Sequence, residues 1–290
     1  MSSAPGINEA VAVYYDTTID LYERLWGEHV HHGFWDPGES PAADGADRHA
    51  AADRLVRELV DFAGVPRDAH VLDVGCGIGG PAIALARDYG ATVEGVTLSE
   101  AQAGRAAERA AEHGVGERTR FRTVDFLVSA YPDASFDAVW AMESVMHIAD
   151  RPAFFAEAFR VLKPGGVLAV ASWCVRDGEL TAAQEDLHQQ VLRHQVMPPL
   201  QSIEAHERMA ADAGFAQVRG TDWTAAVANS WDPTFAQVAM QGGRQFIREL
   251  ARDRGVEVLG FFYAGPVMLE AFATGAMTYG AIRAIRPAQA

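Results

Sequence analysis

The chain has 290 residues, 49% of them hydrophobic and 22% charged, which is the composition of a folded globular protein and excludes a mainly disordered chain. Lysine and arginine number 24 against 39 aspartates and glutamates, and the resulting formal charge of −15 disfavours a nucleic-acid substrate. No stretch approaches the roughly 18 apolar residues of a membrane span, and the N-terminus lacks the basic and apolar segments of a signal peptide. The two cysteines, Cys76 and Cys174, cannot form a disulfide framework, so we expect a cytoplasmic protein.

Strands and helices alternate in the middle of the chain. Residues 48–63 place Leu55, Leu59 and Phe62 on one face of a helix. Apolar runs, glycine stops and capping residues predict the remaining elements. The predicted helices are 79–90, 100–113 and 151–162, and the predicted strands are 70–74, 91–98, 120–125, 135–142 and 167–173. Ser99 and Gln102 predict a capping box at the start of helix 100–113.

This alternation predicts an α/β fold of the Rossmann-like kind, a mostly parallel sheet with helices on both faces. In such a sheet ligands bind at the carboxyl ends of the strands. Residues 1–45 form a predicted aromatic cap, residues 46–175 the core, and residues 176–290 a lid and the end of the sheet. In the last part we predict helices near 181–194, 201–213 and 234–253 and strands at 215–221 and 279–286.

A glycine-rich turn follows the strand at 70–74. Glycines let the backbone approach a ligand and present its amide groups. Gly75, Gly77 and Gly80 match the GxGxxG pattern of dinucleotide sites, which alone is a weak signal. A dinucleotide enzyme also needs an acidic residue at the end of the second strand, whereas Glu94 lies in mid-strand and faces away from Thr97. The position of Glu94 weakens the hypothesis of an NAD(P)-dependent oxidoreductase, which stays open as an alternative.

S-adenosylmethionine (SAM) fits the turn better. This cofactor has no phosphate to be cradled and favours an acidic residue near the loop, which Asp73 supplies. Asp125 and Phe126, at the end of the third strand, offer a carboxylate and a ring for the adenine, and Leu98 offers an opposite wall.

Five stretches between about residues 50 and 175 carry a family resemblance: VLDVGCGIGG, GVTLSEAQ, the pair Asp125-Phe126, FDAVWAMESVMHI and VLKPGGVLAVASW. In their order and spacing the chain resembles the class I SAM-dependent methyltransferases. The resemblance implies that Asp73, Gly75 and Gly77 line the methionine side of SAM and that Thr97 and Leu98 face its ribose and adenine. It also implies that Gln102 lies near the ribose and that Asp125 and Phe126 contact the adenine. Many members have an acidic residue in place of Thr97, so the contact with the ribose is neutral here.

The N-terminal segment carries a narrower resemblance, in Tyr14-Tyr15-Asp16, Leu25-Trp26-Gly27 and residues 29–35. These stretches are similar to the tocopherol and sterol C-methyltransferase branch and to bacterial natural-product methyltransferases, sugar O-methyltransferases among them. The resemblance implies a small lipophilic acceptor and an opening segment that folds over the cofactor. The candidate acceptor-pocket residues are Tyr14, Tyr15, Trp26, Trp35 and Trp173.

Glu143 and His147 follow the fourth strand, where an acceptor would meet the methyl group. His147 is a candidate general base for a hydroxyl or amine acceptor, and Glu143 a candidate to orient it or to set the charge of the site. The resembled sugar O-methyltransferases have a second histidine and a carboxylate where this chain has Met146 and Ser172, which disfavours simple O-methylation. Methylation of a double bond would instead need aromatic faces and a carboxylate around the carbocation.

The cluster His29, His31 and His32 has poor spacing for a metal and no carboxylate close to it in sequence, so we predict packed histidines and no metal. The sequence as a whole predicts a SAM-dependent methyltransferase that tailors a small lipophilic secondary metabolite, with carbon methylation ahead of nitrogen or oxygen. The expected partners are this acceptor and, in a homo-oligomer, further copies of the chain. A non-catalytic SAM-binding module is the second alternative.

Overall fold

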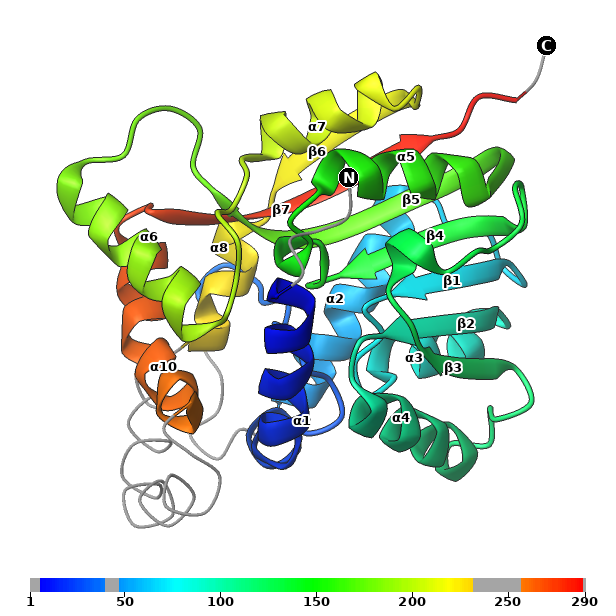
Figure 1. The fold of residues 1–290 in the computed structure, drawn as a ribbon, viewed down its shortest axis with the longest axis horizontal. Coiled ribbons are helices and arrows are strands. Elements are labelled where there is room, and N and C mark those ends of the chain that lie inside the picture. The colour runs from blue at the N-terminus through cyan, green and yellow to red at the C-terminus, as the bar shows by residue number, and fades with distance from the viewer. Residues whose placement is uncertain (1–5, 40–46, 232–256, 289–290) are drawn as a thin grey trace.

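A seven-stranded sheet forms the centre of the computed structural model, which describes residues 6–39, 47–231 and 257–288. The strand order is β3-β2-β1-β4-β5-β7-β6 (Figure 1). The bounds are β1 His70–Val74, β2 Thr92–Thr97, β3 Thr119–Thr123, β4 Phe136–Met142, β5 Leu162–Val175, β6 Ala216–Asp222 and β7 Met277–Ile285. Neighbouring strands pair in parallel except β7, which runs antiparallel to β5 and β6. The predicted, mostly parallel Rossmann-like sheet is therefore confirmed.

The helices cover both faces of the sheet. They are α1 Ile7–Trp26, α2 Arg48–Ala63, α3 Gly80–Tyr89, α4 Glu100–Glu112, α5 Arg151–Val161, α6 Ala182–His194, α7 Ile203–Asp212, α8 Thr224–Val227 and α10 Glu257–Ala273. The sheet separates two hydrophobic cores, one on each of its faces. In β1, Val71 packs with α2 and α3 on one face, and Leu72 packs with α5 on the other. This alternation follows from the period of two in a strand.

Helices α1 and α10 were not among the predicted elements. Helix α1 lies across the carboxyl ends of the parallel strands, between α4 on one side and α10 on the other (Figure 1). Helix α10 contains Pro266, a residue that normally argues against a helix interior. The helix predicted at 234–253 lies outside the described residues.

Half of the predicted capping box at α4 is wrong. The Ser99 hydroxyl accepts the Gln102 backbone N–H at 3.0 Å, as expected. The Gln102 side chain, however, accepts the Thr97 hydroxyl at 2.8 Å, and the Ser99 N–H donates to Thr97 Oγ1 at 3.3 Å. Thr97, at the end of β2, thus takes the contact that a capping box would have used.

The glycine turn brings the ends of β1 and β4 together. Gly75 and Gly77 have φ angles of 79° and 52°, in the left-handed region that favours glycine. A Cβ on Gly75 would lie 2.2 Å from the Cβ of Ser144, whereas a Cβ on Gly77 would meet nothing within 4 Å. The close approach of the two turns therefore requires glycine at position 75.

The two glycines form a matched pair for mutation. We expect Gly75→Ala to lower the free energy of unfolding by about 3 kcal/mol or more, because backbone strain adds to a steric clash. Gly77→Ala should cost about 1–2 kcal/mol, because only the left-handed strain is incurred. Urea unfolding of both variants measures the difference, and equal losses would contradict the close packing of Gly75 on Ser144.

Candidate active site

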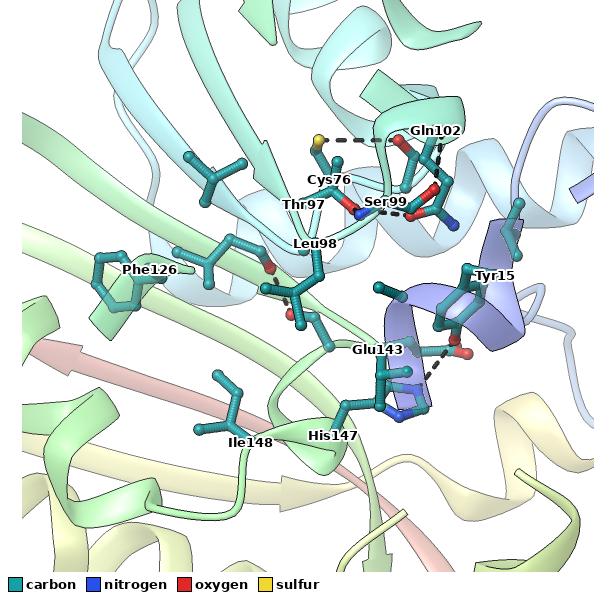
Figure 2. Close-up of a pocket in the computed structure, with 18 of the residues that line it drawn as sticks. Tyr15, Cys76, Thr97, Leu98, Ser99, Gln102, Phe126, Glu143, His147 and Ile148 are labelled. Carbon is teal, nitrogen blue, oxygen red and sulfur yellow. Dashed lines mark hydrogen bonds between the residues drawn. The ribbon is translucent and has the colours of Figure 1, made fainter. Parts of the chain in front are cut away.

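A cavity of about 120 Å³ lies beneath α1 at the carboxyl ends of the strands. It is lined by seven of the predicted cofactor residues, Gly75, Gly77, Thr97, Leu98, Gln102, Asp125 and Phe126, and by both predicted catalytic residues, Glu143 and His147. Among the side chains labelled in Figure 2, Leu98, Phe126, Glu143 and His147 come from the segments that follow β2, β3 and β4. Segments distant in sequence thus converge on one cavity, as the predicted fold requires.

Asp73 lies behind the glycine turn and does not line the cavity. Its side chain is buried, and its Oδ2 has no hydrogen-bond partner among the described residues. Burial raises the pKa of Asp73 to about 7. An unpaired buried carboxylate oxygen is costly, so this position favours a ligand that brings a hydrogen-bond donor or a positive charge. The amino group of SAM has both properties, and the residues present therefore fit this cofactor.

The end of the cavity beside Thr97 and Asp125 is polar. The Thr97 hydroxyl donates to Gln102, so toward a ligand it can only accept a hydrogen bond. Asp125 accepts the Leu127 N–H at 2.9 Å and the Asn8 side-chain amide at 2.7 Å. Glu94 does not line this cavity and lies 3.3 Å from His70 instead, so the acidic residue of a dinucleotide site is not in place.

Helix α1 closes the cavity with one of its faces. Asn8, Val11 and Tyr15 line the cavity. Asp16 accepts the Ser99 hydroxyl, and Glu23 lies 2.8 Å from Arg105 of α4. The opening segment therefore folds over this cavity.

A second cavity of about 30 Å³ adjoins the first. Its walls are mostly aromatic and include Tyr15, Trp26 and Trp173 from the predicted acceptor pocket. Four residues line both cavities, namely Tyr15, Val30, His31 and Glu143. The two cavities therefore meet beside Glu143.

Two predicted pocket residues line neither cavity. Tyr14 is buried, and its hydroxyl lies 3.1 Å from that of Tyr22. Trp35 is also buried, and its indole N–H donates to Ser230 at 3.1 Å. Both side chains support the walls of the site without reaching its cavities.

Several residues of the second cavity were not predicted from the sequence, Tyr22, Gln195 and Trp231 among them. A helical period would have found the first of these, because Tyr15, Tyr22 and Trp26 repeat at seven and four residues and so lie on one face of α1. Gln195 and Trp231 come from the C-terminal part of the chain, and no local pattern indicates their place.

Glu143 is held in an unusual conformation where the cavities meet. Its φ of 50° is left-handed, which is strained for a glutamate. Its buried carboxylate accepts the His32 backbone N–H at 2.9 Å, the Trp173 indole N–H at 3.2 Å and the Tyr279 hydroxyl at 2.9 Å. The His32 ring contributes a fourth contact, with Nδ1 at 2.9 Å.

The tautomer of His32 follows from its other nitrogen. The Trp231 indole N–H can only donate, and it lies 2.5 Å from His32 Nε2, so this nitrogen carries no proton. With Nε2 as the acceptor, His32 donates to Glu143 through Nδ1. Burial by itself would raise the pKa of Glu143, but the interaction with His32 outweighs it and lowers the pKa below its ordinary value. The site thus keeps a buried carboxylate that accepts four hydrogen bonds.

His147 forms a pair with Tyr15. Its Nε2 lies 2.9 Å from the Tyr15 hydroxyl, which points across the cavity from α1 (Figure 2). Burial lowers the pKa of His147 to about 4 and raises the pKa of Tyr15 well above its ordinary value. At neutral pH the pair therefore consists of a neutral imidazole and a protonated phenol, and His147 is a weak base.

The strand order, the glycine turn and the polar residues after β2 and β3 together define a class I SAM-dependent methyltransferase. Residues 72–170 match the methyltransferase-domain family. Over 99% of its length the chain is 31% identical to the tocopherol O-methyltransferase of Arabidopsis thaliana, covering 84% of that protein. It is 33% identical to the 2-methyl-6-phytyl-1,4-hydroquinone methyltransferase of Synechocystis, with 96% of this chain and 88% of that protein covered. The protein belongs to this family of SAM-dependent methyltransferases.

The fold is also shared with a cyclase. The crystal structure of the cyclase SpnF aligns with a TM-score of 0.81 and 29% identity, covering 99% of this chain and 98% of SpnF. Membership of the methyltransferases removes the oxidoreductase alternative. Among the described residues, no helix is both long and apolar enough to cross a membrane.

The pKa of Asp73 predicts a pH-dependent stability. The unfolded carboxyl ionises near its ordinary pKa of 3.8, while the folded carboxyl holds its proton to about pH 7. Between these values the unfolded state binds fewer protons, so the free energy of unfolding falls as pH rises, by up to roughly 4 kcal/mol. In Asp73→Asn we expect the free energy of unfolding not to decrease in this way as pH rises, and SAM to bind more weakly.

Urea unfolding between pH 4 and pH 8, together with calorimetry of SAM binding, measures both effects. The exposed Asp68→Asn, two residues before β1, serves as the control and should follow the wild type. Parallel pH profiles for wild type and Asp73→Asn, with unchanged SAM affinity, would contradict the assignment of Asp73.

Proposed function

We propose that the protein transfers the methyl group of SAM to a carbon atom of a small lipophilic acceptor, in the tailoring of a secondary metabolite. The observation that carries this proposal is Glu143, a strained and buried carboxylate at the junction of the cofactor cavity and an aromatic-lined cavity. Strained backbone is retained where the surrounding structure enforces it, and such positions cluster at functional sites.

The arrangement of the cavities supports transfer between two bound molecules. When bound, SAM supplies an electrophilic methyl group on a sulfonium. An acceptor atom has to be held in line with it, and this positioning accounts for most of the catalysis. The second cavity, at about 30 Å³, has room only for the reacting end of an acceptor. Its shape therefore selects which acceptor atom meets the methyl group.

Charge favours carbon as that atom. When a ring or double-bond carbon attacks the methyl group, positive charge develops on the acceptor. The anionic Glu143 and the faces of Trp26 and Trp173 stabilise such a charge. In a ring acceptor the methylated carbon then releases its proton, and Glu143 is the anionic base that borders both cavities.

Oxygen is the second candidate, because two relatives are named as tocopherol O-methyltransferases. A hydroxyl acceptor needs a base, and the Tyr15–His147 pair lies in the cofactor cavity. Burial keeps the pKa of His147 near 4, which makes it a poor base for a hydroxyl at neutral pH. Ser172 stands where the resembled O-methyltransferases have a carboxylate, and it donates to the Trp173 carbonyl at 3.2 Å.

We also propose a cytoplasmic location. Cys76 and Cys174 are both buried and unpaired, which suits a reducing compartment.

Substitution of Glu143 tests the proposal. We expect Glu143→Gln to lower kcat at least about 100-fold and to change SAM affinity only a few-fold, because the lost charge acts on the reacting acceptor. The control Glu157→Gln removes a carboxylate that pairs with Arg160 on α5, and it should leave kcat unchanged. The assay uses methyl-labelled SAM with prenylated hydroquinones, phenols and unsaturated lipids, and locates the label by NMR.

The outcomes separate the alternatives. Label on carbon, with loss in Glu143→Gln, supports the proposal. Label on oxygen alone refutes carbon methylation, and full activity in Glu143→Gln refutes the role of this carboxylate. Tight SAM binding without turnover on any acceptor would favour a binding module or a reaction of the kind that the cyclase relative performs.

A further inference from the structure

We propose that His29, His49 and Asp53 bind a divalent transition-metal ion of the zinc type, behind the wall of the second cavity. Within residues 6–39, 47–231 and 257–288, these side chains bring one ligand atom each to within 4.8 Å of one another. His49 and Asp53 are four residues apart on α2 and share one face of that helix. His29 comes from the segment after α1, which packs against α2.

The distances suit such an ion. His29 Nε2 lies 3.1 Å from Asp53 Oδ1, and the rings of His29 and His49 are 5.1 Å apart. A second carboxylate oxygen, from Glu28, lies 3.4 Å from His49 Nε2. A tetrahedral zinc ion with nitrogen and oxygen ligands spaces neighbouring ligand atoms by roughly 3.4 Å. Imidazole and carboxylate ligands in this number are those of zinc sites.

A count of hydrogens supports a cation between His29 and Asp53. Three contacts form one chain: His31 Nδ1 to the His32 carbonyl at 2.8 Å, His31 Nε2 to His29 Nδ1 at 2.9 Å, and His29 Nε2 to Asp53 at 3.1 Å. Each contact needs one hydrogen. Two neutral imidazoles carry two hydrogens, and a carboxylate carries none, so one contact lacks its hydrogen.

A metal ion on His29 Nε2 and Asp53 removes this shortfall. His29 Nδ1–H then donates to His31, and His31 Nδ1–H donates to the His32 carbonyl, with both rings neutral. A ligating histidine commonly donates its other N–H to a neighbouring group in this way. Without an ion, a third proton would have to be shared along this chain of contacts.

Neighbouring charges decide which carboxylate is the ligand. Glu28 is shared with Arg109 and His113, each at 3.2 Å, so it is already engaged. Arg87 lies 3.7 Å from Asp53, which is longer than the contacts that Glu28 makes. Asp53 is therefore the third protein ligand, and water completes the shell.

The site would act through the segment that it anchors. A Cβ on Gly80 would lie 2.7 Å from His29 Nδ1, so His29 packs directly against the start of α3. His31, the next histidine in the chain of contacts, lines both cavities. A bound ion would thus fix the wall formed by residues 28–32 without touching the reacting groups.

The test is metal binding by the full chain after treatment with a chelator. Calorimetry with Zn²⁺ should show one ion per chain, and Co²⁺ should give visible absorption of a histidine-ligated ion. We expect His49→Gln to weaken Zn²⁺ binding at least tenfold. Its side chain is 48% exposed, so the fold should tolerate the change, which circular dichroism verifies.

His70→Gln is the matched control, because His70 also pairs with one carboxylate, Glu94, at 3.3 Å, and it should bind Zn²⁺ like the wild type. Asp53→Asn provides a second ligand variant and should also weaken binding. Absence of stoichiometric Zn²⁺ binding by the wild type would overturn the proposal, as would equal affinities of His49→Gln and His70→Gln. A proton shared by His29 and Asp53 would then account for the contact. None of these readouts depends on methyl transfer.

Discussion

The close contact between Gly75 and Ser144 is the constraint on which the site depends. The turns after β1 and β4 approach until a Cβ on Gly75 would overlap with Ser144, and the Ser144 hydroxyl donates to the Val74 carbonyl at 2.5 Å. The chain can reach this position only by a sharp change of direction, and the preceding residue, Glu143, adopts a left-handed backbone conformation. The contact that shapes the cofactor turn therefore also aims the carboxylate at the junction of the two cavities.

Two buried carboxylates near this contact differ in their surroundings. Asp73 has an unpaired oxygen, and burial raises its pKa to about 7. Glu143 accepts hydrogen bonds from His32, Trp173 and Tyr279, and its pKa is lowered. Environments that separate the pKa values of two carboxyl groups assign them different roles. Asp73 is suited to receive a donor brought by the cofactor, and Glu143 to be an anion when positive charge develops on the acceptor.

The sequence predicts the core well because its signals are local. Short apolar runs, the glycine turn and the N-cap at Ser99 define each strand and helix from neighbouring residues, and the strand order then places Thr97 and Asp125 at the cofactor cavity. Contacts between distant segments carry no such signal. His29 meets Asp53 only because α2 packs against the segment after α1, and no carboxylate lies close to the histidine cluster in the sequence. Trp35 shows the converse, since an aromatic residue in the expected segment can point to Ser230 instead of a cavity.

Helix α1 ties the two cavities together. Its N-terminal half covers the cofactor cavity, where Asn8 reaches Asp125, and its C-terminal half supplies Tyr22 and Trp26 to the second cavity. Tyr15, between these halves, borders both cavities and contacts His147. A rigid helix cannot move one half without the other, so opening the cofactor cavity by this helix would also displace the aromatic wall that faces the acceptor. Both molecules would then be enclosed by the same movement, which excludes water from the methyl group once the acceptor is in place.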